Sequence, residues 1–590
     1  MRIYSLQDFI KYLDIHGELI RVKTEVDANL ETTEISIRAL KEGMPALLFE
    51  NVKGARFPLA MNVLASDKRI ELALGKHPDQ LGKELITFME EIMPPKPKIF
   101  FKHPDISKRL YATMPKMTRR PTSQEITGST SLYDLPVITS WPEDGGPFIT
   151  LPQVFTYDPQ DGKRNVGMYR MQIFDSQTTG MHWQIQKGGG FHYFRSQKLG
   201  KEFEIAVALG TDPALLLATV AALPEGMDEV MFSGFLRGKR TRMTKGKSVS
   251  VKVPADAEFI LEGKVHLTDL RMEGPFGDHF GHYSHASKFP VFHINTITHR
   301  KNAIYPATVV GRPPMEDKFL GNATQQVLGP LIRLIHPEIS DLWAYYEAGF
   351  HNLLVVSVEE RYSKEAMKTA LSIMGEGQLS LTKCVVTVSR GVNPRDFKAI
   401  LKAIYMNFNP KYDFIMIPKV PLDTLDFTSY KMNLGSKMIL DATEKRGLHK
   451  TDSRTNSPSE IDQLIKHIDR RIIDSNLLGE TLLVIKVADN GREVVRTLTK
   501  STELTGPKII AAVSPDVDIY DQEQTIWGIF TRFDAERDIM FQEEKLIGIS
   551  PLFSGKMGID ATWKKGYPAP LVMTDEIINK VNDRWDEYWK

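Results

Sequence analysis

The C-terminal half of this 590-residue chain contains an internal repeat, which limits that half to a duplicated fold. Apolar strand-like runs alternate with amphipathic helical runs in both copies, a pattern typical of α/β layers. Three pairs of segments match in the same order: 353–371 with 482–498, 382–396 with 506–521, and 435–443 with 554–562. Two units are too few for a solenoid. We therefore expect tandem α/β units at about 349–446 and 478–565.

A capped helix is expected to join the two units. Ser457, Pro458 and Glu460 combine an N-cap, a proline at the first helical position and the acid of a capping box. The apolar residues that follow are spaced to share one helical face: Ile461, Leu464, Ile465, Ile468 and Ile472.

The middle of the chain predicts a mainly β domain. Runs rich in β-branched and aromatic residues, separated by Gly, Pro and Asp, indicate an antiparallel sheet or barrel. The clearest of these runs are 153–157, 168–174, 249–253 and 291–297. Asp212 followed by Pro213 predicts a helix over 212–222 within this region. Before it, the proline-rich run 93–104 indicates a linker.

Composition excludes several classes of protein. The net charge of +1 gives no support for binding to nucleic acid or to a membrane surface. The single cysteine, Cys384, excludes disulfide frameworks, cysteine-rich zinc sites and iron–sulfur clusters. The first residues lack an apolar signal core, and Asp212 and Pro213 interrupt the most apolar long stretch, 205–223. We therefore expect a soluble, cytoplasmic protein.

A first candidate site lies in the motif NVGMYR, on a predicted strand. Asn165 and Tyr169 share one face of an ideal strand, whereas Arg170 points to the other face. A bulge or a curved strand could bring Asn165 and Arg170 to one pocket. An arginine in an apolar strand needs an anion or a carboxylate as its partner.

A second candidate is the pair Glu273 and Asp278, which are separated by the turn sequence GPFG. A turn can direct both carboxylates into one cavity. One of them can pair there with an arginine while the other keeps its proton longer and acts as an acid. The alternative is a surface turn with two solvated acids.

Two weaker candidates lie nearby in the sequence. Three glycines follow Lys187, and such a run allows the backbone to approach a phosphate closely, although a Gly run is usually an ordinary loop. Glu229 precedes the apolar run MFSGFL, and its alternative interpretation is a solvated acid at a helix end.

Three histidines, His279, His282 and His285, resemble a metal cluster. Their three-residue spacing matches neither the alternation of a strand nor one turn of an α-helix. We therefore favour polar loop histidines over a metal site.

Together these residues resemble the UbiD family of decarboxylases, which use prenylated flavin mononucleotide (prenylated FMN). The resemblance covers nearly the whole chain. It rests on several separated motifs that occur in the family's order. These motifs are MRIYSLQDFIKYL, PEDGGPFITLPQVFTYDP, NVGMYR, DEVMFSGFLRG, MEGPFGDHFG, IYPATVVGRPP and KMGIDAT. The resemblance implies a reversible, non-oxidative decarboxylase of an aromatic or α,β-unsaturated carboxylic acid. Long forms in the family suggest a role in quinone biosynthesis, of the menaquinone or ubiquinone type.

The same resemblance implies a fold that combines α/β and β domains. The typical member has one copy of the C-terminal unit, so the duplication makes this chain a long form. The expected boundaries are 1–120 for an N-terminal α/β domain, 121–316 for a split β-barrel that binds the flavin, 317–348 for a helical linker, 349–446 for the first C-terminal α/β unit, and 447–590 for the linker helix and the second unit.

The resemblance also implies roles for individual residues. The family's arginine and two acids map onto Arg170, Glu273 and Asp278, with Asp where some members have Glu. The positions that match flavin contacts are Met168, Tyr169, Arg170, His182, Trp183, Gln184, Lys187 and Gly188. Asn165 and Glu229 match two ligands of a divalent ion, usually manganese, that bridges the flavin phosphate to protein oxygens. Potassium is a further ion that the resemblance implies.

One departure from the family concerns the metal. Many members have a histidine as a third ligand, and ungapped matching puts Gln186 at that position. An amide oxygen suits a hard cation but binds manganese more weakly than imidazole does, so the resemblance does not fix the affinity or identity of the metal. The substitution favours an alternative, a non-catalytic partner subunit of a carboxylase or decarboxylase complex, whereas the intact arginine and two acids argue against it. A plain flavin reductase is a third interpretation.

The residue types suggest separate roles for the cofactor and for the three side chains. Decarboxylation leaves an electron pair behind, and no side chain stores it well, so a cofactor should supply the electron sink. We expect Arg170 to orient the substrate carboxylate, Glu273 to pair with Arg170, and Asp278 to protonate the carbon after CO₂ leaves. The expected partners are a small carboxylic acid, a flavin prenyltransferase that supplies the cofactor, and further copies of the chain in a homo-oligomer.

Overall fold

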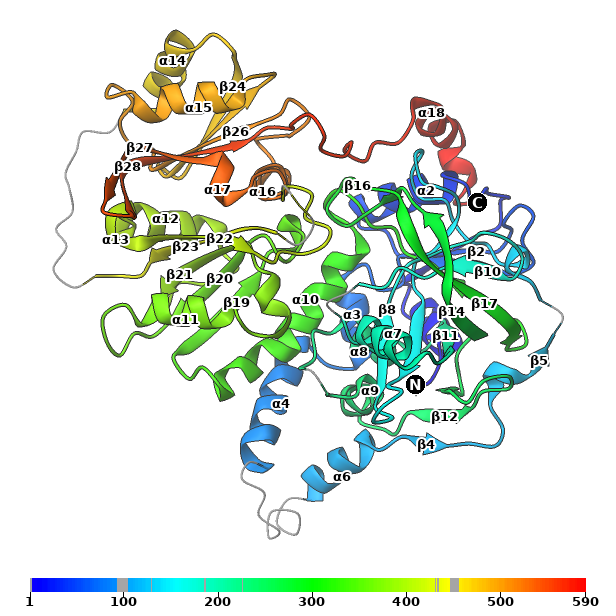
Figure 1. Ribbon diagram of the computed structural model, residues 1–590. Coiled ribbons are helices and arrows are strands. Elements are labelled where there is room, and N and C mark those ends of the chain that lie inside the picture. Colours follow the sequence, from blue (N-terminus) through cyan, green and yellow to red (C-terminus); the bar gives the residue numbers. More distant parts are fainter. Residues whose placement is uncertain are drawn as a thin grey trace. The chain divides into compact units, whose positions relative to one another are not determined.

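The computed structural model describes residues 3–92, 104–128, 130–184, 187–224, 226–429, 431, 434–445 and 456–590. The chain divides into two compact units: unit 1 is 1–328 with 569–590, and unit 2 is 329–568 (Figure 1). The expected linker at 93–104 lies outside the described residues except for its last position, and Gln186 lies outside them too. Within the described ranges, none of the helices has the length and apolar character needed to span a bilayer.

The N-terminal part of unit 1 packs helices against a small mixed sheet of order β1-β2-β3-β18. Its strands are β1 (Leu19–Val22), β2 (Ala46–Phe49), β3 (Leu59–Met61) and β18 (Tyr305–Pro306). Its helices are α1 (Leu6–Ile15), α2 (Glu31–Lys41), α3 (Asp67–Leu74) and α4 (Pro78–Ile92). Strand β2 is buried along its length because each residue of ALLF is apolar and strands flank it on both sides. Leu6 and Ile10 of α1 pack in one core cluster with Leu48 of β2.

An antiparallel half-barrel sheet forms the centre of unit 1, as the predicted fold class requires (Figure 1). Among the described residues its order is β10-β17-β14-β11-β7-β8, and β5 pairs with β17. Its strands are β5 (Ile126–Thr127), β7 (Gln153–Tyr157), β8 (Arg164–Met168), β10 (Thr178–Gly180), β11 (Phe203–Leu209), β14 (Phe259–Glu273) and β17 (Ser287–His299). Alternating apolar residues of these strands bury one face in a core that includes Phe155, Ala206 and Ile260.

Short strands and helices complete unit 1. The short strands are β4 (Lys116–Met117), β6 (Phe148–Ile149), β9 (Met171–Gln172), β12 (Arg242–Lys245), β13 (Lys252–Pro254), β15 (Phe276–Gly277) and β16 (Tyr283–Ser284). The helices are α6 (Pro104–Thr113), α7 (Gly188–Leu199), α8 (Pro213–Val220), α9 (Glu229–Arg237), α10 (Glu316–Leu328) and α18 (Asp575–Arg584). The predicted helix over 212–222 is confirmed as α8, which Asp212 caps by accepting from Ala214 N and Leu215 N.

Two of the predicted strands differ in the structure. The run 168–174 is not one strand, because β8 ends at Met168 and β9 covers only Met171–Gln172. The run 249–253 contains only the start of β13, which begins at Lys252. The other two runs, 153–157 and 291–297, are confirmed within β7 and β17.

Unit 2 contains two five-stranded sheets with the same order, which confirms the tandem α/β units: β19-β20-β21-β23-β22 and β24-β25-β26-β28-β27. The first has β19 (Ile339–Ala344), β20 (Leu354–Val358), β21 (Cys384–Ser389), β22 (Phe414–Val420) and β23 (Gly435–Ala442). The second has β24 (Ile472–Leu478), β25 (Leu482–Val487), β26 (Ile509–Val513), β27 (Ile539–Ile547) and β28 (Ser550–Ala561). The helices are α11 (Glu365–Ile373), α12 (Phe397–Asn407), α13 (Pro410–Asp413), α14 (Pro458–Ile468), α15 (Gly491–Lys500), α16 (Gln522–Phe530) and α17 (Ala535–Asp538).

The predicted capped helix is confirmed as α14. Ser457 accepts from Glu460 N, and Glu460 accepts from Ser457 N, so the capping box is complete. Ile472 is not part of this helix: α14 ends at Ile468, and Ile472 starts β24 within the same core cluster. The segment 317–348, expected to be a helical linker, also contains β19, the edge strand of the first sheet.

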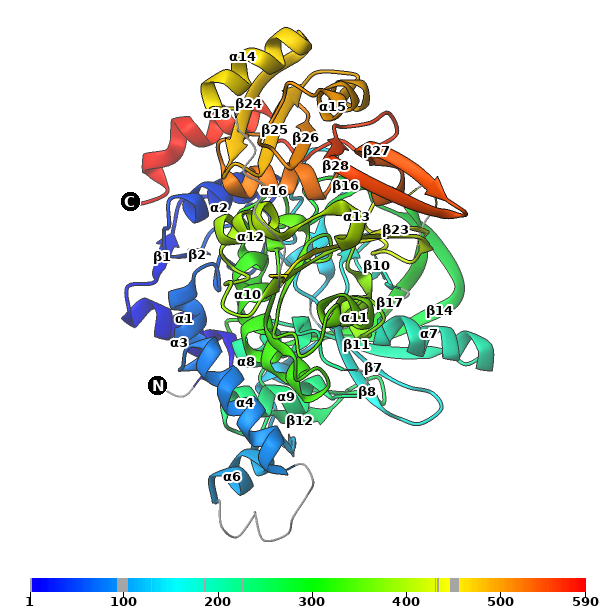
Figure 2. The same cartoon turned by 90° about the vertical axis from the view of Figure 1, so that its left-hand side faces the viewer.

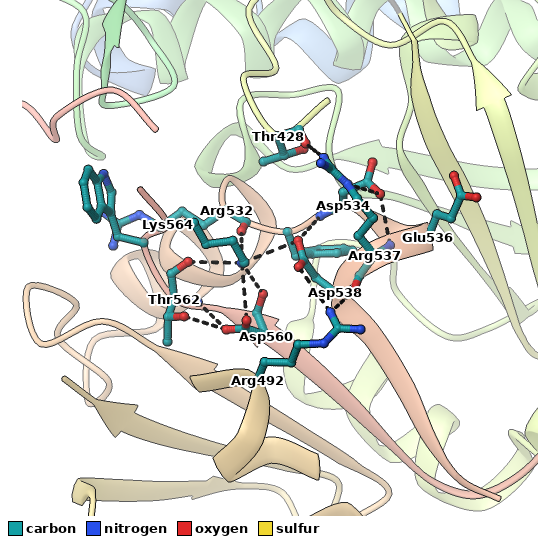
Figure 3. A network of polar contacts seen from close by, with 12 residues as sticks. Thr428, Arg492, Arg532, Asp534, Glu536, Arg537, Asp538, Asp560, Thr562 and Lys564 are labelled. Atoms are coloured by element: carbon teal, nitrogen blue, oxygen red, sulfur yellow. Dashed lines mark hydrogen bonds and ion pairs between the residues drawn. The ribbon is translucent and has the colours of Figure 1, made fainter. Parts of the chain in front are cut away.

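Both copies end a central strand with the motif DATxK and an internal ion cluster, and Figure 3 shows the cluster of the second copy. In the second copy, Lys564 Nζ donates to Asp560 O at 2.8 Å and lies 3.4 Å from Asp538 Oδ2. In the first copy, Lys445 Nζ lies 3.4 Å from Asp413 Oδ1, on the equivalent short helix. Each lysine thus ties the end of its strand to a short helix, which makes this a structural feature of the repeat.

The last residues of the chain, 569–590, pack in unit 1, although the expected boundaries assign them to the second C-terminal unit. Buried Glu31 of α2 accepts from Arg584 Nη1 at 2.5 Å and from Tyr588 Oη at 2.8 Å, and it pairs with Lys580 Nζ at 2.9 Å. Helix α18 and helix α2 lie side by side in both views (Figure 2). These charged contacts anchor the C-terminal helix on the N-terminal part of unit 1.

Candidate functional site

Arg170 lies in the short bend between β8 and β9. Strand β8 pairs with β7 as far as Met168, and β9 pairs with β6 from Met171. The chain therefore passes from one sheet to another at residues 169–170, and Arg170 is not part of an ideal strand. This bend, and not a bulge within one strand, sets the direction of the arginine.

The guanidinium of Arg170 brings the three predicted catalytic residues together. Its Nε donates to Glu273 Oε1 at 2.9 Å, and its Nη1 donates to Asp278 Oδ2 at 2.6 Å. Its Nη2 donates to Ser284 Oγ at 2.9 Å. The guanidinium also lies 4.7 Å from the centre of the Phe276 ring, a cation–π contact. Arg170 is 103 and 108 residues from its two acids in the sequence, so the fold creates this cluster.

The turn that carries the two acids is held in place and is not the solvated surface turn of the alternative interpretation. Glu273 ends β14 and its side chain is fully buried, while the side chain of Asp278 is 11% exposed. Gly274 has φ +91°, which a residue with a side chain rarely adopts. The C-terminal segment contacts the far end of the turn, where Leu571 N donates to Gly281 O at 3.0 Å.

Both acids of the cluster are ionised at neutral pH. Burial acts to raise the pKa of Asp278, but the hydrogen bond and charge of His279 and the charge of Arg170 outweigh it and lower the pKa to about 2. Burial also opposes ionisation of Glu273, yet the hydrogen bond from His182 and the charge of Arg170 lower its pKa. Burial and the charge of Arg170 lower the pKa of His182, whose Nδ1 lies 2.9 Å from Glu273 Oε2.

His279 belongs to the site, although the sequence indicated only a polar loop histidine. Its Nδ1 lies 2.6 Å from Asp278 Oδ1, and its backbone N donates to the same oxygen at 2.7 Å. His282 is buried with Nδ1 3.0 Å from Phe280 O, whereas His285 is exposed. No group of three or more His, Cys, Asp or Glu side chains that could hold a metal ion occurs in the described ranges.

A second cluster lies at the N-terminus of α7, where Gly188 is the first helical residue. A Cβ at Gly188 would lie 2.1 Å from Asn165 Oδ1, and a Cβ at Gly189 would lie 2.8 Å from the Trp183 ring. Gly189 N donates to Tyr169 Oη at 3.0 Å. The glycines thus let a helix N-terminus approach the end of β8 closely, and such a terminus is a favourable place for a phosphate.

Asn165 and Glu229 lie next to Gly188 and Gly189 at the N-terminus of α7, a site that we call the cradle. Asp228 caps α9 and pairs with Arg164, which fixes Glu229 at the first position of the helix. Glu229 Oε2 accepts from Val166 N at 2.9 Å, and burial raises the pKa of Glu229 to about 7. Asn165 Nδ2 is buried, and it has no hydrogen-bond partner among the residues that the structure describes. A phosphate oxygen would satisfy that donor and a cation would keep Glu229 ionised, so both residues fit the implied phosphate and metal.

The remaining predicted positions that the structure describes fall near one cluster or the other. Met168 is the last residue of β8, and Trp183 lies with its ring 5.1 Å from that of Tyr169. Lys187 is the N-cap of α7, and its backbone N donates to Gln184 O at 3.1 Å. Gln186, the predicted third metal ligand, lies outside the described residues.

Comparison with known proteins assigns this fold to the carboxy-lyases. Models for the domains of 3-octaprenyl-4-hydroxybenzoate carboxy-lyase match the chain: the N-terminal domain at 10–89, the Rift-related domain at 116–313, and the C-terminal domain at 318–442 and 477–561. The chain belongs to the UbiD family, and it is a decarboxylase of that type.

Relatives and solved structures agree with this assignment. An uncharacterized protein of Archaeoglobus fulgidus is 44% identical over 75% of this chain and 92% of its own length. A Chlamydia pneumoniae protein, named as one of the subunits of 4-hydroxybenzoate decarboxylase, is 36% identical over 97% of this chain and 96% of its own. The structure of vanillic acid decarboxylase from Sedimentibacter hydroxybenzoicus, in closed form, matches with TM-score 0.68 and 25% identity over 78% of this chain and 98% of that one. The UbiD-class enzyme HmfF from Pelotomaculum thermopropionicum, in complex with FMN, matches with TM-score 0.63 and 25% identity over 77% and 98%.

Proposed function

We propose that this chain reversibly decarboxylates a 4-hydroxylated aromatic carboxylic acid with prenylated FMN as its cofactor. The observation that carries the proposal is the guanidinium of Arg170, held between Glu273 and Asp278 in the half-barrel unit. The name of the Chlamydia pneumoniae relative and the vanillic acid decarboxylase structure support the substrate class, because vanillic acid is also a 4-hydroxylated benzoic acid. A solved HmfF structure with prenylated FMN supports the cofactor.

The cradle at α7 is where the chain's residues would hold this cofactor. We propose that Gly188 faces its phosphate, that Asn165 Nδ2 donates to it, and that Asn165 and Glu229 are oxygen ligands of an accompanying divalent ion such as manganese. When bound, the prenylated flavin supplies the electron sink that decarboxylation needs. A homo-oligomer and a flavin prenyltransferase as cofactor supplier remain expectations from the family.

In the proposed reaction, Arg170 binds the substrate carboxylate. Glu273 pairs with Arg170 Nε and its side chain is fully buried, whereas Asp278 pairs with Arg170 Nη1 and part of its side chain is exposed. The substrate carboxylate therefore displaces Asp278 rather than Glu273, and Arg170 orients it with a charge-assisted hydrogen bond. Displacement takes the Arg170 hydrogen bond away from Asp278, while His279, whose hydrogen bond and charge are the larger cause of its low pKa, stays in contact; a proton can then pass from His279 to Asp278.

The protonated Asp278 completes the proposed turnover. When CO₂ leaves, the electron pair of the broken C–C bond remains with the substrate carbon, and the proton of Asp278 moves to that carbon. One carboxylate and one proton thus give one CO₂ and one C–H bond. His279, whose Nδ1 lies 2.6 Å from Asp278 Oδ1, is the side chain in place to return a proton to the acid. Carboxylation uses the same groups in reverse.

A substrate panel tests this proposal. The enzyme, produced together with a flavin prenyltransferase, is incubated with 4-hydroxybenzoate, vanillate, a 3-prenylated 4-hydroxybenzoate, benzoate and cinnamate, and CO₂ release is measured. We expect turnover of the 4-hydroxylated benzoates and none of benzoate. Turnover of the prenylated acid would support the proposed setting in quinone biosynthesis. Turnover of cinnamate alone would contradict the substrate class and leave the reaction type standing.

Gly188→Ala is expected to weaken cofactor binding. The new methyl group would overlap Asn165 Oδ1, and such overpacking costs about 1–3 kcal/mol, or roughly a fivefold to 150-fold loss of affinity. Flavin absorbance per chain measures the effect after the cofactor is titrated into the apoprotein. The matched control is Gly329→Ala, where a Cβ meets open space. Equal flavin binding by both variants would contradict the proposed cradle.

A further inference from the structure

A separate segment, residues 143–145, supports the turn that carries the two acids. Gly145 N donates to Pro275 O at 2.8 Å. Gln172 also links this segment to the turn. Gly274 N donates to Gln172 Oε1 at 2.8 Å, and Gln172 Nε2 donates to Gly145 O at 2.5 Å. A Cβ at Gly145 would lie 2.4 Å from Gly274 O, so only glycine permits this close approach.

The side chain of Asp144 contacts the turn directly. Its Oδ1 accepts from Gly277 N at 2.7 Å, and Gly277 directly precedes Asp278. Its Oδ2 accepts from Ser140 N at 3.1 Å and from Trp141 N at 2.9 Å. The carboxylate therefore ties the backbone next to the catalytic acid to a turn 133 residues earlier in the sequence.

We propose that Asp144 is a positioning residue for Asp278 and that its ionised form holds the Gly277 backbone so that the Asp278 carboxylate meets Arg170. The role rests on the proposed function. Asp144 does not contact the Arg170–Asp278 pair through a hydrogen bond of its own side chain. It acts through the peptide N–H of Gly277, and loss of that bond frees the turn at the residue beside the acid.

The surroundings of Asp144 make this support sensitive to pH. Burial raises the pKa of Asp144 to about 6, against the hydrogen bonds from Gly277, Trp141 and Ser140 and the charge of Arg170. Among the described residues, Tyr283 also interacts electrostatically with Asp144, and burial raises the pKa of its phenol to about 12. The carboxyl of the neighbouring Glu143 is exposed.

The sign of the effect follows from this pKa. Asp144 loses its proton as pH rises through about 6, and the ionised form accepts all three N–H groups. As pH falls through the same value, the protonated form loses acceptor strength and the turn loosens. Asp278 and Glu273 have lowered pKa values and stay ionised over this range, so they do not produce the change in the free enzyme.

Asp144→Asn tests the proposal, and Glu143→Gln is the matched control because it removes the neighbouring exposed carboxyl. We expect Asp144→Asn to lower kcat about 100-fold through misplacement of the acid, with KM changed less than about threefold because Arg170 still binds the carboxylate. In the wild type, kcat/KM, which reports the free enzyme, falls below about pH 6. This decrease should disappear in Asp144→Asn and persist in Glu143→Gln. A retained acid limb in Asp144→Asn would overturn the proposal.

Hydrogen exchange gives a readout that needs no substrate. We expect the amide of Gly277 to exchange at least about tenfold faster in Asp144→Asn than in the wild type, with the amides of β7 unchanged. Equal exchange at Gly277 in Asp144→Asn and Glu143→Gln would overturn the positioning role. Faster exchange in an enzyme that turns over no acid would support the backbone link and reject the proposed function instead.

Discussion

Asp278→Asn is expected to remove turnover while the folded protein still binds its flavin. Asparagine keeps the size of the side chain and can still accept from Arg170, but it carries no proton that it could transfer to carbon. General acid catalysis contributes roughly 10²–10⁴-fold, so kcat should fall by about that factor. The measurement is kcat with the best acid of the panel, with flavin per chain taken from absorbance of the same sample.

Asp278→Glu is the matched control for this prediction. It keeps the acid on a longer arm, as in some family members, so part of the activity should remain and kcat should exceed that of Asp278→Asn. Normal turnover by Asp278→Asn would contradict the proton-donor role. Loss of flavin together with activity would mean that the turn of residues 274–284 supports the cofactor site, and Asp278 would then lose its assigned role.

Lys383→Met is expected to destabilise unit 2 by about 3–5 kcal/mol, because it leaves a buried carboxylate without its cation. Lys383 Nζ lies 3.0 Å from Asp426 Oδ2, and both side chains are fully buried. The ammonium also donates to Phe533 O at 2.9 Å, so it links the first copy of the repeat to the second. For a unit of this size the free energy converts to a fall in Tm of roughly 6–20 °C, measured by calorimetry at a fixed scan rate.

Two further variants separate the loss of this buried ion pair from the effect of replacing any lysine by methionine. Lys466→Met removes the cation of an exposed pair with Asp462 on α14 and should cost less than about 0.5 kcal/mol. The double variant Lys383→Met with Asp426→Asn removes both buried charges and should recover much of the lost stability. If Lys383→Met melted like Lys466→Met, the buried pair would contribute nothing to the fold.

Local patterns in the sequence were sufficient for much of the fold. The capping box at Ser457 and the Asp212–Pro213 start of α8 are confirmed, because these signals involve residues within a few positions of one another. The internal repeat predicts two equal sheets, and their strand orders agree. Strand limits were less predictable: the apolar run 168–174 gave no sign that the chain changes sheets at Arg170.

The sequence predicted which residues form the site better than it predicted the contacts between them. Family motifs singled out Arg170, Glu273 and Asp278, and the structure brings them within hydrogen-bond distance; their catalytic roles stay predictions. The sequence pattern did not reveal His279 as the partner of Asp278, because its spacing to the other two histidines drew attention to a metal cluster. Asp144 lies in a motif that carries the resemblance, yet its contact with Gly277 spans 133 residues and needs the folded chain.

The measurement that tests the account most directly is the mass of the cofactor released from the purified protein. The chain is produced together with a flavin prenyltransferase, purified, denatured, and the released flavin is identified by mass spectrometry and counted per chain. The account predicts prenylated FMN at about one per chain, as expected for a decarboxylase that needs an electron sink. A folded protein that, supplied with manganese, releases no flavin would contradict it and favour a non-catalytic partner subunit.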